Sequence, residues 1–221
     1  MPPSSTAPPA SPPPRPGFPL PLELVRRLGS SRFNYWFGYV ANLGLVAWLM
    51  SRALAAGPVP VSPTRWVLLV VAGLFSWTLA EYWLHRLLYH QVASFLSQGH
   101  GLHHREPKAL FGVPWYLTTA ALLLVHVVLA RLFDPASVAL VMAGNWTGYV
   151  LYCLAHHGSH HWRYRRGWLR AMQHHHLVHH AHPDFNWGFT TSLWDRVFGT
   201  HYPPREGVLG PARRRERSRR V

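Results

Sequence analysis

The sequence is poor in acidic residues, in lysine and in cysteine. Among 221 residues it has 8 Asp and Glu against 22 Lys and Arg, and Lys108 is the only lysine. Charged residues make up 14% of the chain, below the roughly 25% of an ordinary soluble domain, which argues against a soluble globular protein. The one cysteine, Cys153, excludes an intrachain disulfide and leaves the redox compartment undetermined.

The net charge of +14 does not indicate a nucleic-acid-binding protein. The arginines flank apolar runs, whereas a nucleic-acid interface interleaves them with exposed aromatic residues on a polar domain. Their distribution is typical of contact with anionic lipid at one membrane face. We therefore predict a membrane, and no nucleic acid, among the partners. The preference for arginine over lysine favours GC-rich coding and hence a bacterial source.

The two ends of the chain differ in composition from its middle. Residues 1–21 hold 10 of the 20 prolines and show no apolar periodicity, which predicts a disordered Pro-rich leader. They lack the basic start, short apolar core and small-residue cleavage site of a secretory signal. Residues 206–221 are predicted to be a basic tail, which leaves residues 22–205 as the membrane domain.

Four stretches are long and apolar enough to cross a bilayer, whose hydrocarbon core needs about 20 helical residues. They are 33–51; 66–80, continuing through Trp83 and Leu84 despite Glu81; 109–130, with a helix start near Pro114; and 135–162. A soluble bundle of buried helices would need polar outer faces that these stretches lack. We predict an all-α integral membrane protein with about four transmembrane helices.

The charges that flank these stretches predict an orientation. Arg15, Arg26, Arg27 and Arg32 precede the first span and arginines crowd residues 213–220, while the opposite loops hold Arg52, Arg65, Arg131 and Asp134. By the positive-inside rule, both termini lie in the cytoplasm. We expect a multi-pass protein of the bacterial cytoplasmic membrane.

Histidine is the most informative residue of the sequence. All 17 histidines fall between His85 and His201. Most form four clusters: His85 and His90; His100, His103 and His104; His156, His157, His160 and His161; and His174, His175, His176, His179 and His180. With four spans, all four clusters lie at one membrane face, which predicts a histidine-rich helical cap on the cytoplasmic side.

The spacing of the clusters predicts metal binding. Residues three or four apart share one face of a helix, so His156 and His160 can face one centre. A His-x-x-His-His run can serve two adjacent ions. Neutral imidazole suits zinc, copper, iron and nickel. A lone histidine on an apolar face is usually a hydrogen-bonded core residue, but four spaced clusters are not explained in that way.

The order of these motifs resembles the fatty acid hydroxylase superfamily of membrane di-iron enzymes, relatives of the sterol desaturases. The order is His-x4-His, His-x-x-His-His, His-x3-His-His and His-x-x-His-His. The surrounding segments Glu81-Tyr82-x-x-His85-Arg86, His100-Gly-x-His103-His104-x-x-Pro107 and Gly188-Phe189-Thr-Thr-Ser-x-Trp194-Asp195 look most like the fatty acid 2-hydroxylase branch, which acts on sphingolipid acyl chains. The resemblance covers roughly residues 77–200.

The resemblance implies a di-metal hydroxylase domain over residues 22–205, with two iron ions and O2 as co-substrate. Carried over by motif position, the metal ligands are His85, His90, His100, His103, His104, His156, His160, His176, His179 and His180. His176 is chosen from the run 174–176 because only this register completes His-x-x-His-His. Zinc can replace iron in a purified sample because it often binds nitrogen ligands more tightly than Fe²⁺.

Further polar residues are candidates for contacts to the ligand imidazoles. They are Glu81, His157, His161, His175, Asp184 and Asp195. A carboxylate that accepts a hydrogen bond from a ligand histidine fixes its tautomer. The alternatives are that Asp195 caps a helix and that Glu81 pairs with Arg86. His126 and His201 are expected to be non-ligands.

The implied activity is hydroxylation of a fatty acid or sphingolipid acyl chain, near its carboxyl end. Many 2-hydroxylases of this kind carry a fused cytochrome b5 domain, and the leader has no histidine to ligate haem, so we expect a separate ferredoxin or cytochrome as electron donor. The histidine spacing leaves open a sterol or carotenoid hydroxylase or desaturase of the same superfamily. A non-enzymatic metal-binding or transport protein is the alternative from another class.

Overall fold

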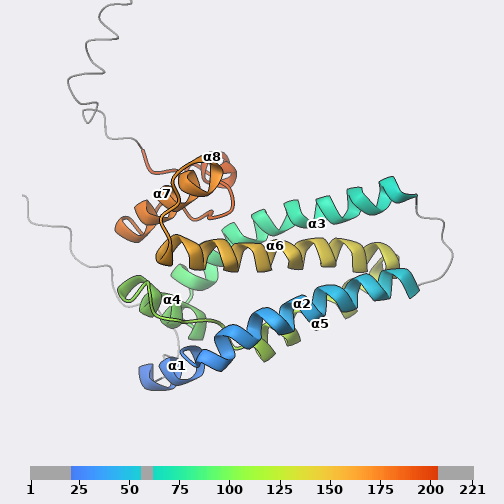
Figure 1. Ribbon diagram of the computed structural model, residues 1–221, viewed down its shortest axis with the longest axis horizontal. Coiled ribbons are helices and arrows are strands. Elements are labelled where there is room, and N and C mark those ends of the chain that lie inside the picture. Colours follow the sequence, from blue (N-terminus) through green and yellow to red (C-terminus); the bar gives the residue numbers. More distant parts are fainter. Residues whose placement is uncertain (1–20, 56–61, 204–221) are drawn as a thin grey trace, which may run out of the picture.

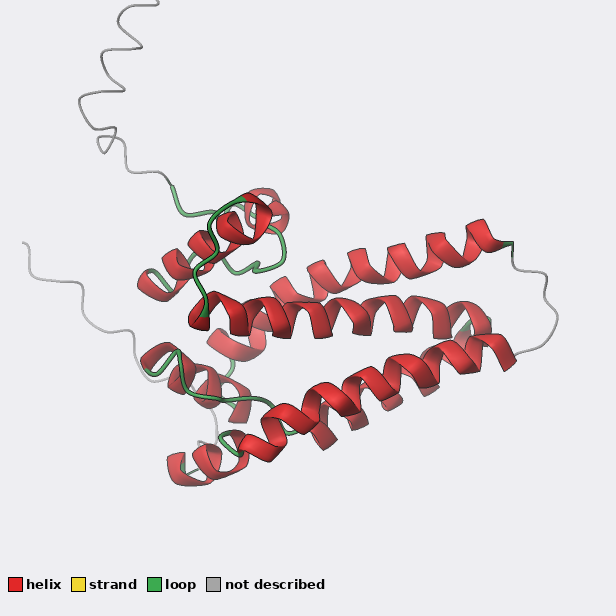
Figure 2. Cartoon of the chain, viewed as in Figure 1, coloured by secondary structure: helices red, strands yellow, loops and turns green. Residues whose placement is uncertain are grey.

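The computed structural model describes residues 21–55 and 62–203, which fold entirely into helices and connecting loops (Figure 2). The predicted leader, apart from residue 21, and the predicted basic tail lie outside the described residues. The extent of the domain that we expected over residues 22–205 stays a prediction.

Four long helices form the body of the protein. They are α2 (Arg32–Ala55), α3 (Pro63–Trp83), α5 (Trp115–Leu132) and α6 (Pro135–His161). They run side by side in Figure 1, and each is long and apolar enough to cross a membrane, α3 as part of a 29-residue stretch that ends at Gln91. The prediction of an all-α, multi-pass membrane protein with four transmembrane helices is confirmed.

The helix ends follow from local sequence. Pro63 and Pro135 occupy the first turns of α3 and α6, where their missing N–H groups have no intrahelical partner in any case. The side chains of Ser62 and Asp134 cap these two helices. Helix α5 begins directly after Pro114, which is the start that the sequence predicted within the stretch 109–130.

Two glycines let α3 and α6 approach closely. A Cβ atom at Gly73 would overlap the carbonyl oxygen of Val141, and one at Gly144 would overlap that of Val70. Small residues at helix contacts allow this packing in membranes, where the lipid supplies no hydrophobic force between helices. The contact holds α3 and α6 side by side along their length.

The remaining helices gather at one end of the bundle. They are α1 (Leu22–Gly29), the π-helical turn η1 (Leu84–Gln91) that continues α3, α4 (Phe95–Arg105), α7 (Gly167–Ala181) and the short α8 (Leu193–Val197). Figure 1 shows α1, α4, α7 and α8 at the same end of the four long helices. The predicted histidine-rich helical cap is present. That this end faces the cytoplasm stays a prediction.

Candidate metal centre

Ten histidines from distant parts of the chain meet in the cap. The first histidine group consists of His85, His90, His100, His104 and His179, and the second consists of His103, His156, His160, His176 and His180. Within each group, one ring nitrogen from every residue lies within 4.8 Å of the others. The structure thus brings together all ten residues that the motifs singled out, and His176, not His174 or His175, completes the second group.

Helices α4 and α7 each serve both groups, in a reciprocal way. On α4, His100 and His104 belong to the first group and His103 to the second. On α7, His176 and His180 belong to the second group and His179 belongs to the first. Successive helical residues point about 100° apart, so the adjacent pair in a His-x-x-His-His run diverges toward two centres. The rings of His104 and His180 stack at 4.3 Å between centroids, which places the groups next to each other.

The π-helical turn η1 explains how His85 and His90 reach the same group. In an α-helix, residues five apart would point about 140° away from each other. In a π-helix the backbone bonds run from i to i+5, which brings such residues to one face. The backbone N–H of Val92 bonds the carbonyl of Leu87 in this pattern, at 2.8 Å. Sequence reasoning expected a plain helical continuation here and missed the π turn.

Two backbone carbonyls orient histidine rings in the first group. The Nδ1–H of His85 donates to the carbonyl oxygen of Trp187 at 2.5 Å, and that of His179 donates to the carbonyl of Phe185 at 2.7 Å. A carbonyl only accepts, so the proton of each neutral ring is on Nδ1 and the lone pair of Nε2 faces the group. The buried Nε2 of His179 has no hydrogen-bond partner among the described residues.

The second group contains more facing nitrogens than hydrogen bonds can satisfy. Nε2 of His176 lies 2.9 Å from Nε2 of His156, 2.8 Å from that of His160 and 3.1 Å from that of His180. A neutral ring nitrogen has either one proton or one lone pair, so His176 can satisfy at most one of these three neighbours. A cation that accepts several lone pairs at once fits such a donor set.

Burial keeps the cap histidines neutral. It lowers the pKa of His104 to about 4, with the neighbouring His180 adding to the effect, and it lowers the pKa of His180 to about 4. Burial, followed by the surrounding imidazoles, holds the pKa values of His100, His103 and His176 well below the usual range. At neutral pH these rings therefore present lone pairs, the form that binds a metal.

We expect the metal-free protein to lose stability as the pH falls from about 6.5 to about 4. The unfolded chain takes up protons near the ordinary histidine pKa of 6.5, whereas His104 and His180 stay neutral in the folded protein until about pH 4. The unfolded state thus binds more protons throughout this window, and the free energy of unfolding decreases with decreasing pH. The apparent Tm of chelator-treated protein in detergent, measured between about pH 7.5 and 4.5, checks this. A Tm that stays constant over this range contradicts it.

Two buried carboxylates hold the loop that carries the orienting carbonyls. We call residues 185–190 the support loop. Asp195 is completely buried and accepts hydrogen bonds from the backbone N–H groups of Trp187 and Gly188, at 2.8 and 2.9 Å, and from the Thr200 hydroxyl. It also accepts from Nε2 of His175 at 3.0 Å. Asp195 is therefore connected to His85 of the first histidine group through the backbone of Trp187.

Glu81 supports the other end of the same loop. Its carboxylate accepts from the backbone N–H groups of Phe189 and Thr190 and from the Thr190 hydroxyl. The sequence suggested a bond from Glu81 to an imidazole or to Arg86, but Arg86 donates to the Tyr82 hydroxyl. Both carboxylates thus reach the histidine groups through backbone.

The other candidates lie outside the two groups. Asp184 is exposed, and the carbonyl of the next residue, not the Asp184 carboxylate, accepts the bond from His179. His157 bonds the Tyr35 hydroxyl at 2.8 Å, and the exposed His161 stacks on it. His126 packs against Trp48, and His201 packs near His175. Neither His126 nor His201 belongs to the two histidine groups, and that they are not ligands stays a prediction.

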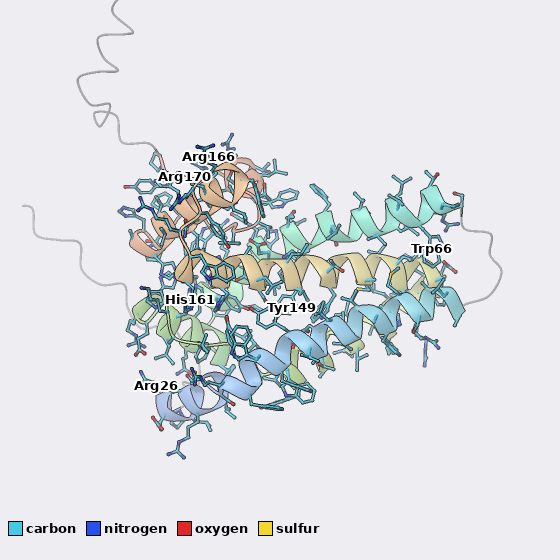
Figure 3. All side chains as sticks on the ribbon, viewed as in Figure 1. Arg26, Trp66, Tyr149, His161, Arg166 and Arg170 are labelled. Atoms are coloured by element: carbon cyan, nitrogen blue, oxygen red, sulfur yellow. The ribbon has the colours of Figure 1, made fainter. Side chains whose placement is uncertain are left out.

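A cavity of about 130 Å³ leads from the histidines into the membrane region. It touches His100, His103 and His156, and its wall also includes Asn34, Tyr35, Tyr39, Asn42, Tyr89, Tyr149 and Tyr152. Figure 3 shows Tyr149 between α6 and α2. Sequence reasoning missed these polar residues. Their signal is the spacing of Tyr35, Tyr39 and Asn42, which lie on one face of an otherwise apolar span.

Comparison with known proteins identifies the family. Residues 70–200 match the family model described as fatty acid hydroxylase. The chain belongs to the fatty acid hydroxylase family. The matched region includes every histidine of the two groups, as well as both carboxylates that hold the support loop.

Relatives and a solved structure agree with this membership. This family member is 37% identical to a dihydroceramide fatty acyl 2-hydroxylase of Arabidopsis thaliana over 142 residues. The aligned region covers 60% of each protein. A second such Arabidopsis enzyme is 32% identical, and the alignment covers 75% of this chain and 73% of the length of that enzyme. The human fatty acid 2-hydroxylase is 33% identical, and the alignment covers 61% of this chain and 40% of the length of the human protein.

The fold is similar to that of a solved fatty acid hydroxylase domain. In a structure of full-length scs7p only the hydroxylase domain is visible, and this chain matches it with a TM-score of 0.68 and 28% identity. The match covers 83% of this chain and 70% of that one. The chain spans 60% of the length of the first Arabidopsis relative and 40% of the length of the human one.

Proposed function

We propose that the protein is a membrane monooxygenase that hydroxylates a lipid acyl chain with O2 and electrons from a separate donor. The observation that carries the proposal is the pair of adjacent five-histidine groups, at the end of a transmembrane bundle and open to a cavity. Membership in the fatty acid hydroxylase family supports the reaction class.

The two groups are proposed to hold two iron ions, one in each. Iron is well matched to imidazole ligands, and two iron ions would supply the O2 activation that insertion into an unactivated C–H bond requires and that side chains cannot supply. The chain contributes the positions of the ten rings and the carbonyls of Trp187 and Phe185, which set the tautomers of His85 and His179. Zinc bound in a purified sample would be consistent with the same donor set.

The substrate is proposed to be a fatty acid or a sphingolipid acyl chain, oxidised near its carboxyl end. Two of the relatives are named as dihydroceramide fatty acyl 2-hydroxylases. The histidine groups lie at the end of the spans, where a lipid headgroup stays hydrated while its first acyl carbons approach the metals. The cavity beside His100, His103 and His156 offers space for such a chain.

The electron donor and the orientation are further proposals. The donor is an acidic ferredoxin or cytochrome, because the arginine-rich chain attracts a negatively charged protein. The positive-inside rule supports a bacterial cytoplasmic membrane, with the cap and both termini in the cytoplasm. These assignments are consistent with each other, because a soluble donor reaches the cap from the cytoplasm.

Mass spectrometry of lipids from cells that express the protein tests this function. We expect a +16 Da acyl species whose fragments place the oxygen next to the carboxyl carbon, absent from cells with the vector alone and from cells with His103→Ala. Oxygenated or desaturated sterols or carotenoids would instead support the alternative substrate class. A change in cellular metal content without any oxidised lipid would favour metal transport and would contradict the proposal.

A further inference from the structure

A basic groove lies on the face of the cap formed by α7 and α8. We use this name for an open groove of about 820 Å³ whose wall includes Arg163, Arg170 and Arg196 together with His174 and His201. Among the residues that the structure describes, no Asp or Glu lines the groove. The function proposed above does not use this groove.

The arginines of the groove are not neutralised within the described part of the chain. There, Arg26 pairs with Glu106, Arg27 pairs with Glu23, and the remaining ion pair is that of His175 with Asp195. Arg163, Arg170 and Arg196 are exposed and take part in none of these pairs. Three unpaired guanidinium groups around one groove repel each other, and an anion that accepts bidentate hydrogen bonds relieves this repulsion.

The end of α7 adds to the positive field. The helix begins at Gly167, which lines the groove, and the preceding Arg166 makes no side-chain capping bond. A helix N-terminus carries a partial positive charge and free N–H groups. Figure 3 shows Arg166 and Arg170 together at this end of α7, at the opposite end of the bundle from Trp66.

Contacts between α8 and α3 place the groove at the level of the membrane boundary. Trp194 packs on Phe75 at 5.7 Å between centroids, and its Nε1–H donates to the Thr78 hydroxyl at 2.9 Å. Directly after the end of α8, Phe198 packs on Trp83 at 5.1 Å. Phe75, Thr78 and Trp83 all belong to the membrane-spanning stretch that ends at Gln91. Arg196, between Trp194 and Phe198, therefore lies beside the last turns of α3, which ends at Trp83.

Exposed apolar residues accompany the lining residues of the groove. Trp162, which lines the groove, is 60% exposed, and Trp168 and Val197, which follow the lining residues Gly167 and Arg196 in the sequence, are 54% and 59% exposed. Exposed tryptophans beside arginines are typical of the headgroup layer, where the rings contact acyl carbons and the guanidinium groups reach phosphates. A surface that docks a soluble acidic protein has no need of such apolar neighbours beside a span, which favours lipid over protein as the occupant.

We propose that the basic groove binds the phosphate headgroup of an anionic phospholipid, whose acyl chains lie against the exposed apolar residues beside α8. Arg170 and Arg196 contact the phosphate. Binding stabilises the cap, because His175 in the groove wall is hydrogen-bonded to Asp195, which holds the support loop and, through Trp187, the ring of His85. A hydrogen-bonded path thus runs from His175 in the groove wall through Asp195 and the backbone of Trp187 to His85.

Thermal unfolding of the delipidated, full-length protein tests the proposal. In mixed detergent micelles, phosphatidylglycerol is expected to raise the apparent Tm by about 3–6 °C, as a ligand that binds only the folded state does. Phosphatidylcholine, and inorganic phosphate at the same total phosphate concentration, are expected to leave the Tm unchanged. Native mass spectrometry should show phosphatidylglycerol retained on the wild-type protein.

Variants at two groove arginines provide the decisive comparison. Arg170→Gln/Arg196→Gln should lose the response to phosphatidylglycerol while keeping the wild-type Tm in phosphatidylcholine. Arg131→Gln, an exposed arginine at the end of α5 that does not line the groove, is the matched control and should keep the response. Arg170→Lys/Arg196→Lys retains the positive charge and should keep at least part of the response to phosphatidylglycerol. This variant is used if the glutamine variant does not fold.

Three results overturn the proposal. The first is an equal response to phosphatidylglycerol in wild type and in the folded glutamine variant. The second is a full response to inorganic phosphate alone, which would make the groove a site for free anions. The third is a glutamine variant that keeps the lipid response but loses binding of a soluble acidic ferredoxin, which would make the groove a protein-docking surface. None of these depends on catalysis, so failure of the proposed function leaves the lipid proposal testable.

Discussion

Replacing either His179 or His176 by alanine is expected to lower oxygenated product by at least about 100-fold. Loss even of a residue that orients a ligand typically costs about 10- to 100-fold in metal affinity or activity, and here a ligand itself is removed. His179 belongs to the first group and His176 to the second, so the two variants test the two centres separately. Metal bound per chain, measured by elemental analysis after iron loading, should fall from about two to about one in each.

His161→Ala is the matched control for these variants. His161 is exposed, belongs to neither group and stacks on His157. It should keep the full metal content, and its product level should stay within about twofold of wild type. If His176→Ala and His179→Ala kept two ions and normal product, the assignment of the ten ligands would be wrong. Loss of product in all three variants would indicate that the readout reports folding instead of ligation.

Asp195→Asn is expected to have the second largest effect, although Asp195 belongs to neither histidine group. Its two carboxylate oxygens accept from two backbone N–H groups, the Thr200 hydroxyl and His175. The asparagine side chain has only one accepting oxygen, and its NH2 group faces hydrogen-bond donors of the neighbouring residues. Each buried donor left without an acceptor costs about 1–3 kcal/mol. We expect a loss of about 3 kcal/mol in stability, or about 6–12 °C in Tm.

The same substitution should also lower activity, because the support loop carries the carbonyl that orients His85. Measured at a temperature where the variant is folded, product formation should fall while one iron-loaded group remains detectable. Asp184→Asn is the control, since Asp184 is exposed two residues before the buried part of the loop. A stable, active Asp195→Asn protein would show that the loop is held by other contacts.

The sequence predicted the membrane helices well because their signals are local. A bilayer requires about 20 apolar residues for every span, and this requirement is visible without any knowledge of tertiary contacts. Proline marked the start of α5, which begins directly after Pro114, for the same reason. The ten histidines could be singled out because the order of four motifs is specific to a family, and the family model over residues 70–200 confirms this membership.

The features that sequence reasoning missed depend on contacts between distant residues. The bond of Glu81 to Thr190 spans 109 positions, and the bond of His85 to Trp187 spans 102. No periodicity encodes such pairs. The π turn that aligns His85 with His90 was missed as well, because a helix with one altered turn has the same apolar pattern as a regular one.

By itself, then, the sequence determined that this chain crosses a membrane four times and gathers its histidines at one end of the spans. Both properties follow from hydrophobic length and from motif spacing, which are written along the chain. Tertiary structure alone decided how the ten rings divide into two groups, which carbonyls set their tautomers and where the cavity and the basic groove lie. These depend on the reciprocal contributions of α4 and α7 and on close packing of α3 and α6, and such packing is specified only when distant side chains meet.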